Sequence, residues 1–350
     1  MTYSPIKTAV IGYGFSAKTF HIPFLTSLNE FELVAISTRK QEARDDWDKL
    51  EHYDRAEDLL LHSDAELVII TAPNDVHFKL AKTALENGKH VIIEKPFVTN
   101  VADGETLISL AKEKDLILSV YHNRRWDGDF LTVKKMLDDK RFGKLTHFES
   151  HYDRFRPEVR QRWREQTEIG GGILFDLGSH LLDQAICLFG LPEAISADCK
   201  MMRDGSTNVD YFHLILHYPD HQAILHGDMF TAGPNKRFTV KGTQGTYDKY
   251  GFDPQEERLI AGVQPIADEW SVESPSQYGH FYDTDGSCVI ETESGCYQAY
   301  FNQIAKAVRN GSPCPVSAED ALQNIRLIEL AMESSRIGEK LPVKTLLKPE

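Results

Sequence analysis

The chain of 350 residues is poor in basic residues, in cysteine and in long hydrophobic runs. Lys and Arg together number 39 against 53 Asp and Glu, which gives a formal net charge of −14. This balance argues against a general nucleic-acid binder and against binding to an anionic membrane, since both require a basic surface. It still permits one local anion pocket made of backbone amides and one or two basic side chains.

Cysteine is scarce, odd in number and without CxxC spacing: Cys187, Cys199, Cys288, Cys296 and Cys314. This predicts reduced thiols that serve as small buried apolar groups. The first residues show no basic segment followed by a long apolar one, so no secretory signal is expected. Apolar runs stop far short of the ~20 residues that cross a bilayer. We therefore expect a cytoplasmic protein.

Residues 1–121 alternate short apolar runs with amphipathic stretches. Strands are predicted at residues 7–11, 32–37, 67–71, 90–93 and 117–121, and helices at 18–28, 56–62, 77–87 and 102–114. Gly88 is expected to end the third of these helices, because glycine enters the left-handed region without penalty. The alternation predicts a doubly wound α/β fold, with a parallel sheet covered by helices on both faces.

Beyond residue 121 the pattern predicts an α+β domain with a largely antiparallel open sheet. Helices are expected at 130–137, 178–189 and 318–337, and strands at 144–155, 210–218, 222–230, 237–241 and 246–250. Along the first of these strands, Phe148 and Tyr152 fall on one face, and the other face carries His147, Glu149, His151 and Asp153. Turn residues at 219–221 and 242–245 predict two hairpins. Residues 255–297 are left unassigned.

A glycine-rich turn, Gly12-Tyr13-Gly14-Phe15-Ser16-Ala17, directly follows the first strand and opens a helix. Small residues at positions 12, 14 and 17 permit a tight turn, close approach of a pyrophosphate and close helix–strand packing. The helix start adds amide donors and a positive dipole. In this strand–turn–helix context the motif predicts a dinucleotide-binding Rossmann domain.

The end of the second strand bears on the choice of dinucleotide. NAD-specific sheets place a carboxylate there for the ribose 2′-hydroxyl, whereas this chain reads Ser37-Thr38-Arg39-Lys40. Ser37 and Arg39 can hold a 2′-phosphate, so NADP(H) is the preferred cofactor and NAD(H) the alternative. A solvated basic turn is the other interpretation.

Two further turns follow strands at their carboxyl ends, where ligands of such sheets bind. The first supplies Thr71, Pro73, Asn74 and His77, although a proline-initiated turn that caps the next helix explains it equally well. The second is Glu94-Lys95-Pro96. The Lys95 ammonium can donate to a reacting oxygen, or it can be an ordinary surface lysine.

In the second half, Asp176, His180 and Asp183 stand at i, i+4 and i+7 of a predicted helix, hence on one face. An imidazole next to a carboxylate is well suited to act as a general base near neutral pH. A metal site and a buried structural histidine are the alternatives. No second histidine lies at ligand spacing on this helix, which disfavours the metal.

Together, the motifs at 12–17, 71–77, 94–96 and 176–180 resemble the Gfo/Idh/MocA family of nicotinamide-dependent oxidoreductases. The resemblance covers essentially the whole chain. Residues 122–127, 149–157 with 162–164, and 253–258 look most similar to the bacterial branch that contains NADP-dependent scyllo-inositol dehydrogenases. The resemblance implies two domains, a cofactor domain at 1–123 and a substrate-binding and oligomerisation domain at 124–350.

The resemblance also implies roles for individual residues. Lys95 lies beside nicotinamide and substrate, His180 is the general acid/base, and Asp176 holds a substrate hydroxyl. Further cofactor contacts come from Asn123 and Arg124 at the crossover and from a loop with Trp163 and Arg164. The family pairs subunits through its open sheet, which implies a homodimer or homotetramer.

These observations predict an NADP(H)-dependent oxidoreductase that interconverts an alcohol and a ketone on a cyclic polyol or sugar. Substrate contacts are expected from Lys95, Asp153, Asp176 and His180, with His151 and Arg154 nearby on the long strand. An aldose or anhydro-sugar reductase is the alternative among oxidoreductases. A non-catalytic NADP(H)-sensing protein and a metal-dependent hydrolase are the alternatives from other classes.

Overall fold

The computed structural model describes residues 4–160, 170–267 and 269–346. The chain divides into two compact units. Unit 1 comprises Met1–Asn123, Gln255–Ser271 and Cys296–Leu322, and unit 2 comprises Arg124–Pro254, Val272–Gly295 and Gln323–Glu350. The chain first leaves unit 1 after Asn123, where the sequence placed its boundary. The two units are nevertheless not contiguous in sequence as the predicted domains 1–123 and 124–350 are, because Gln255–Ser271 and Cys296–Leu322 return to unit 1.

Unit 1 is built on a six-stranded sheet in the order β3-β2-β1-β4-β5-β6, with every pair parallel. Its strands are β1 (Ile6–Ile11), β2 (Phe31–Ser37), β3 (Glu51–Tyr53), β4 (Leu67–Ile70), β5 (His90–Ile93) and β6 (Leu118–Val120). All four residues of β4 are fully buried, as expected for a parallel strand that helices cover on both faces. The predicted doubly wound sheet is confirmed.

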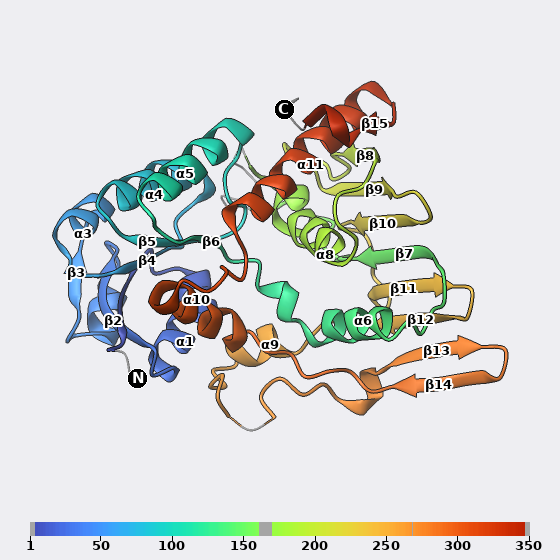
Figure 1. Cartoon of the computed structure of the whole chain (residues 1–350), viewed down its shortest axis with the longest axis horizontal. Helices are drawn as coiled ribbons and strands as arrows, with labels where there is room; N and C mark the ends of the chain where they lie inside the picture. The colour runs from blue at the N-terminus through green and yellow to red at the C-terminus, as the bar shows by residue number, and fades with distance from the viewer. Residues whose placement is uncertain (1–3, 161–169, 268, 347–350) are drawn as a thin grey trace. The chain divides into compact units, whose positions relative to one another are not determined.

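Helices lie on both faces of this sheet, with α3, α4 and α5 on one side and α1 and α10 on the other (Figure 1). The helices of unit 1 are α1 (Ile22–Ser27), α2 (Gln41–Asp46), α3 (Ala56–His62), α4 (His77–Glu86), α5 (Val101–Glu113), α9 (Gln255–Ile260) and α10 (Gln298–Asn310). Asn100 caps α5 by accepting a hydrogen bond from the Asp103 amide, 2.9 Å. Gly88, with φ +72°, follows α4 as predicted.

Aromatic packing explains why α10 returns to unit 1. Phe301 of α10 stacks on Phe24 of α1 with ring centroids 4.9 Å apart, and the Tyr300 hydroxyl lies 2.8 Å from Ser119 Oγ at β6. Phe24, Tyr300 and Phe301 are fully buried. Burying such rings stabilises the fold by roughly 2–3 kcal/mol each, so the sheet face under α1 depends on a segment 277 residues further along the chain, the separation between Phe24 and Phe301.

Unit 2 is built on a nine-stranded sheet in the order β14-β13-β12-β11-β7-β10-β9-β8-β15. Its strands are β7 (Leu145–His151), β8 (Ala194–Lys200), β9 (Tyr211–His217), β10 (Gln222–Gly227), β11 (Lys236–Gly242), β12 (Gly245–Tyr250), β13 (Gly279–Asp283), β14 (Gly286–Ile290) and β15 (Leu341–Pro342). Only the β7–β10 pair is parallel among these described strands. Both predicted hairpins, β9–β10 and β11–β12, are present.

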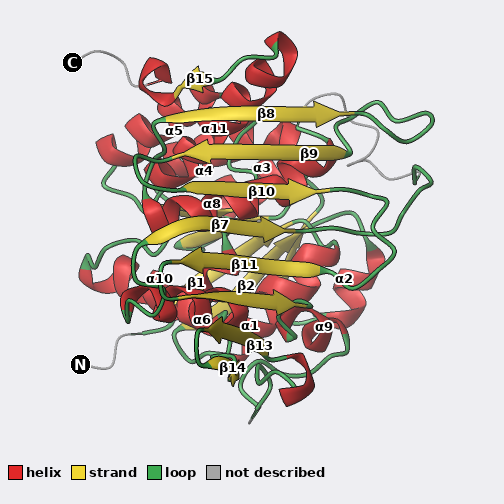
Figure 2. Ribbon diagram, turned by 90° about the vertical axis from the view of Figure 1, so that its right-hand side faces the viewer, coloured by secondary structure: helices red, strands yellow, loops and turns green. Residues whose placement is uncertain are grey.

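The helices of unit 2 lie on one face of this sheet, and no described helix covers the other face (Figures 1 and 2). They are α6 (Gly128–Asp138), α8 (Ser179–Phe189) and the part of α11 (Ala318–Ile337) that follows Leu322. Along β9, Phe212, Leu214 and Leu216 are fully buried against the helices, and the residues between them are half-buried. This alternation is the pattern of an antiparallel sheet packed on one side.

Some sequence-based expectations differ from the structure. The helix predicted over 18–28 begins with a π-helical turn, Ala17–His21, before α1. The strand predicted over 144–155 ends at His151, with one isolated bridge at Phe155. No cysteine forms a disulfide, but Cys187 and Cys288 are exposed, so the prediction of buried thiols is wrong for these two. Among the described residues, no helix is long and apolar enough to span a membrane.

Candidate active site

The glycine-rich turn joins β1 to the helix above it in unit 1. Gly12 has φ +99°, and a Cβ added there would lie 2.6 Å from Thr71 Oγ1. Its amide donates to the Ser37 carbonyl, 2.9 Å. Glycine is therefore required at position 12 by the protein itself, both for its backbone conformation and for its approach to the end of β4.

Gly14 is different, because a Cβ added there would meet nothing within 4 Å. Packing within the protein gives no reason for glycine at this position. A ligand that approaches the backbone closely does give one, and a pyrophosphate at the start of a helix is such a ligand. Phe15 is 55% exposed next to it, and buried Ala17 opens the π-helical turn. These residues fit a dinucleotide.

The end of β2 offers a cation to this turn. Ser37 is buried, whereas Arg39 is exposed and forms no hydrogen bond or ion pair with any described residue. Lys40, which no motif in the sequence marks as a site residue, donates from Nζ to the Tyr13 carbonyl, 2.9 Å. The Lys40 ammonium therefore lies at the glycine-rich turn, through a contact between two loops that are far apart in sequence.

The turn after β4 is attached to the turn after β5 by His77. Its ring is fully buried, with Nδ1 3.0 Å from the Pro96 carbonyl oxygen and Nε2 2.9 Å from the Ala72 carbonyl oxygen. Burial lowers the pKa of His77. The imidazole therefore holds the two turns together, and the groups of this turn left to contact a ligand are half-buried Thr71, exposed Pro73 and half-buried Asn74.

Glu94 holds the next turn, which carries Lys95, to the glycine-rich helix. Its Oε1 accepts a hydrogen bond from the Ser16 hydroxyl and lies 2.8 Å from His21 Nε2, and its Oε2 accepts from the Lys95 amide, 3.1 Å. Burial alone would raise the pKa of Glu94, but the hydrogen bond and charge of His21, with the help of Ser16 and Lys95, outweigh burial and lower it to about 2. Glu94 is thus a fixed anion that positions half-buried Lys95, whose peptide bond to Pro96 is cis.

The crossover segment leaves unit 1 at Asn123, which is 5% exposed. In unit 2, Arg124 places its guanidinium carbon 4.9 Å from the centre of the Tyr152 ring, and its Nη1 lies 3.3 Å from Asp127 Oδ2. Arg124 is therefore held in position from two sides. Trp163 and Arg164, expected on a loop near the cofactor, lie outside the described residues.

The motif with Asp176, His180 and Asp183 lies in unit 2, where a π-helical turn, Leu174–Gly178, continues into α8. Such turns are rare and occur often at functional sites. Asp176 lies in the π-helical turn with 23% of its side chain exposed, and His180 lies in the first turn of α8 and is 5% exposed. Asp183, the third member of the predicted face, is occupied by a two-point ion pair with Arg125. Asp176 and His180 are thus the residues of this motif left to contact a ligand, because the Asp183 carboxylate is used in the ion pair with Arg125.

The segment after β7 contributes one residue to this pair. Arg154 Nη1 lies 4.0 Å from Asp176 Oδ2. Asp153 instead lies with His151 Nδ1, 3.0 Å from its Oδ2, and with His226 Nε2, 3.8 Å from its Oδ1. Successive side chains of an extended segment point to opposite sides. Of these two neighbours, Arg154 is thus the one whose side chain lies near Asp176, and substrate contact by Asp153 stays a prediction.

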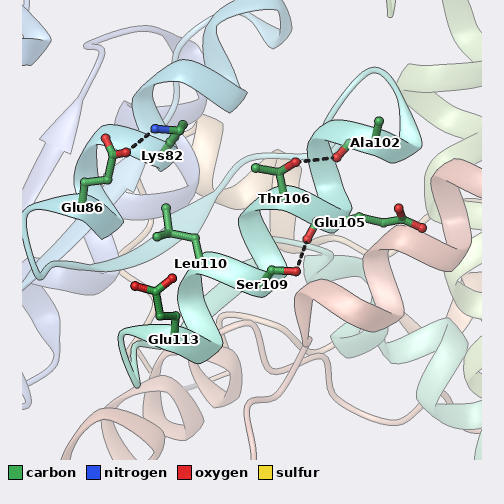
Figure 3. Close-up of a pocket in the computed structure, with 8 residues that line it drawn as sticks. All are labelled: Lys82, Glu86, Ala102, Glu105, Thr106, Ser109, Leu110 and Glu113. Carbon is green, nitrogen blue, oxygen red and sulfur yellow. Dashed lines mark hydrogen bonds and ion pairs between the residues drawn. The ribbon is translucent and has the colours of Figure 1, made fainter.

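A surface groove between α4 and α5 is not part of this site (Figure 3). Its hydroxyls are used within α5, since Thr106 donates to the Ala102 carbonyl and Ser109 to the Glu105 carbonyl, 2.9 Å each. Lys82 pairs with Glu86 across one helical turn. None of the motif residues lines the groove, so we assign it no ligand.

Comparisons with known proteins agree with the motifs in both units. The profile of the oxidoreductase family's NAD-binding Rossmann fold matches residues 6–122, and that of its C-terminal alpha/beta domain matches residues 134–345. This chain belongs to the Gfo/Idh/MocA oxidoreductase family. It is accordingly an NAD(P)-dependent dehydrogenase or reductase that acts on CH–OH groups.

Similar proteins extend along nearly the whole chain. The uncharacterized oxidoreductase YdgJ of Escherichia coli is 43% identical over 95% of this chain and 96% of its own length. The scyllo-inositol 2-dehydrogenase (NADP(+)) IolW of Bacillus subtilis is 40% identical over 95% and 94%. Among solved structures, the oxidoreductase yvaA of Bacillus subtilis superposes with a TM-score of 0.93 at 38% identity, over 98% of this chain and 99% of that one.

Proposed function

We propose that this oxidoreductase uses NADP(H) to interconvert a secondary alcohol and a ketone on a cyclic polyol of the scyllo-inositol type. The observation that carries the proposal is a polar group at the π-helical turn and the start of α8. Arg154 Nη1 lies 4.0 Å from the Asp176 carboxylate, and the His180 imidazole follows in the first turn of α8. Such a set suits a ligand rich in hydroxyls, because wrong substrates leave buried polar groups unpaired. The 40% identity with the NADP(+)-dependent relative supports the same class of substrate.

The cofactor preference rests on the end of β2. Arg39 is exposed, it has no partner among the described residues, and no carboxylate stands in the Ser37-Thr38-Arg39-Lys40 turn. A guanidinium forms strong charge-assisted hydrogen bonds with a phosphate, and a carboxylate here would repel one. The turn therefore favours a dinucleotide with a 2′-phosphate.

In the proposed reaction, a bound nicotinamide supplies the hydride acceptor or donor. His180 takes the hydroxyl proton during oxidation and returns it during reduction. The Lys95 ammonium donates a hydrogen bond to the reacting oxygen and so stabilises the negative charge that develops there. Asp176 accepts a hydrogen bond from a neighbouring hydroxyl and, with Arg154, orients the ring. Glu94 acts through the Lys95 backbone and is a positioning residue.

The test follows nicotinamide absorbance with NADP+ and NAD+ separately against inositols, aldoses and their oxidised forms. We expect turnover with scyllo-inositol and NADP+, and a loss of at least about a hundredfold in kcat for His180→Ala and for Lys95→Ala, with NADPH binding retained. His217→Ala and Lys79→Ala serve as controls, since His217 bonds Ser196 and Lys79 pairs with Glu57.

Other outcomes favour other functions. Faster turnover of aldoses or anhydro-sugars than of inositols would make the enzyme a sugar reductase. Tight NADPH binding with no turnover across the panel would instead make it a cofactor sensor. Unchanged kcat in either motif variant would contradict the roles given to His180 and Lys95.

We further propose that subunits associate through the face of the unit 2 sheet that no described helix covers. Half-buried Ile215 and Ile224 face each other there across β9 and β10, which leaves apolar surface in contact with water. Light scattering after gel filtration should report a dimer or tetramer, and Ile224→Asp should lower the measured mass. A monomeric parent protein would contradict this assembly.

A further inference from the structure

The open face of the unit 2 sheet carries a row of histidines at its centre. The strand register pairs His213 of β9 with His226 of β10, and His226 with His151 of β7. These three strands lie side by side in the middle of the sheet (Figure 2). Ring centroids are 5.4 Å apart for His213 and His226, and 5.1 Å apart for His226 and His151.

Two of these imidazoles converge on one carboxylate. His151 Nδ1 lies 3.0 Å from Asp153 Oδ2, and His226 Nε2 lies 3.8 Å from Asp153 Oδ1. One ligand atom from each of the three residues lies within 4.8 Å of the other two. Asp153 is only 5% exposed, and its Oδ1 accepts no hydrogen bond from any described residue. A buried carboxylate oxygen without a donor is costly unless another positive group contacts it.

We propose that His151, Asp153 and His226 bind a divalent first-row transition metal ion. Two imidazole nitrogens and one carboxylate oxygen suit Zn²⁺ and its neighbours, whereas Mg²⁺ and Ca²⁺ prefer oxygen ligands alone. In a tetrahedral zinc site with bonds of about 2.0–2.2 Å, ligand atoms lie roughly 3.4 Å apart. One ligand atom from each of the three side chains lies within 4.8 Å of the others, so the side chains have to move closer together when an ion binds.

The outer contacts of both imidazoles fit this role. Glu149 Oε1 lies 2.7 Å from His151 Nε2, and His213 Nδ1 lies 3.4 Å from His226 Nδ1. A metal-binding histidine commonly donates its other ring N–H to a carboxylate or another acceptor, which fixes the ring and its tautomer. His151 Nδ1 thus faces Asp153, and His226 Nε2 lies between two carboxylates, 3.8 Å from Asp153 Oδ1 and 3.7 Å from Asp228 Oδ2.

Without an ion, the His151 ring lies between the carboxylates of Asp153 and Glu149. Burial lowers the pKa of His151, but hydrogen bonds from its ring to Asp153 and Glu149 outweigh burial and raise it to about 9. The competing account is an imidazolium held permanently between two carboxylates, with no affinity for metal.

Calorimetry with ZnCl2 on the full-length protein separates these accounts. The parent protein for this experiment is the variant with Cys187→Ser and Cys288→Ser, which lacks the two exposed thiols. Bound metal is first removed with a chelator, which is then itself removed. We expect one zinc ion per chain. Asp153→Asn and His226→Gln should each weaken binding by at least about a hundredfold. His217→Gln is the matched control, since His217 lies on the same face but bonds Ser196, 2.9 Å, and it should bind zinc like the parent protein.

Absence of saturable zinc binding in the parent, or equal affinity in His226→Gln and the parent, would overturn the proposal. If Asp153→Asn fails to fold, His226→Gln alone decides. Cobalt supplies a second readout, because visible absorption by bound Co²⁺ should be lost in the same variants and kept in His217→Gln. Polyol turnover is assigned to His180 and Lys95, so His226→Gln should keep it, and failure of the metal site is distinguishable from failure of the proposed function.

Discussion

Arg125 and Asp183 form a two-point ion pair, with Arg125 Nε 2.8 Å from Asp183 Oδ2 and Nη2 2.7 Å from Oδ1. Their side chains are 13% and 3% exposed. Planar bidentate pairing of this kind is the strongest geometry available to a guanidinium and a carboxylate. It attaches α8, the helix that carries His180, to the segment by which the chain enters unit 2.

Asp183→Asn should therefore destabilise the folded protein by about 3 kcal/mol, because it removes the charge that pairs with a nearly buried guanidinium. Denaturant unfolding measures this change. The matched control is Asp138→Asn, in the exposed pair with Lys134 whose side chains are 67% and 45% exposed. That change should cost no more than about 0.5 kcal/mol. Equal losses in the two variants would contradict the structural role of Asp183.

Gly14→Ala should separate cofactor binding from folding. The added Cβ meets nothing within 4 Å, so the thermal midpoint should stay within about 2 °C of the parent protein. The methyl group would nevertheless occupy the space that a pyrophosphate needs, and the Kd for NADPH should rise at least about tenfold. Fluorescence titration measures the Kd. Unchanged affinity would contradict the placement of the dinucleotide.

Gly12→Ala should behave differently, because there the added Cβ lies 2.6 Å from Thr71 Oγ1 and the backbone has φ +99°. We expect a loss of about 1–3 kcal/mol in the free energy of unfolding, measured without any ligand. A variant as stable as the parent would show that the turn relaxes and that glycine is needed at position 12 for the ligand alone.

The strands of unit 1 are largely predictable from sequence, because a parallel strand buried on both faces is an unbroken apolar run, as in β4. The same reasoning does not find β8, whose residues include Asp198 and Lys200 and are mostly half-buried. That strand is stabilised by pairing along its whole length with β9. Since the pairing is not local, no short window of sequence contains it.

The candidate site is predictable from sequence only where its residues are close together along the chain. Asp176 lies in the π-helical turn and His180 in the first turn of α8 that follows, so their spacing in sequence is enough to place them on neighbouring turns. Glu94 and His21 are 73 residues apart, and their contact depends on how the glycine-rich helix packs over β5. Which neighbour, Asp153 or Arg154, faces Asp176 depends on strand register, where a shift of one residue exchanges the two faces.

Arg39→Ala should weaken NADPH binding by about 10–100-fold, since a charge-assisted hydrogen bond contributes roughly 1.5–3 kcal/mol. NADH binding should change little, because the exposed guanidinium has no described partner whose loss would disturb the turn. The two Kd values, measured side by side in low salt, check this. An equal loss of affinity for NADPH and NADH would show that Arg39 binds a group that both dinucleotides share and does not bind the 2′-phosphate.

Glu94 should make stability depend on pH in a defined window. Its pKa is lowered from 4.5 to about 2 in the folded state, so ionised Glu94 stabilises the fold fully above about pH 5, and that stabilisation is lost as the pH falls toward 2. Glu94→Gln removes the ionisation. The difference in unfolding free energy between parent and variant should be about 3 kcal/mol near pH 7 and smaller by about 2 kcal/mol at pH 3.

Glu57→Gln is the control, because this carboxylate pairs with the exposed ammonium of Lys79 and its contribution should change much less over the same range. A Glu94→Gln difference that stays constant from pH 7 to pH 3 would show that the carboxylate's hydrogen bonds, and not its charge, hold the glycine-rich helix to the turn that carries Lys95.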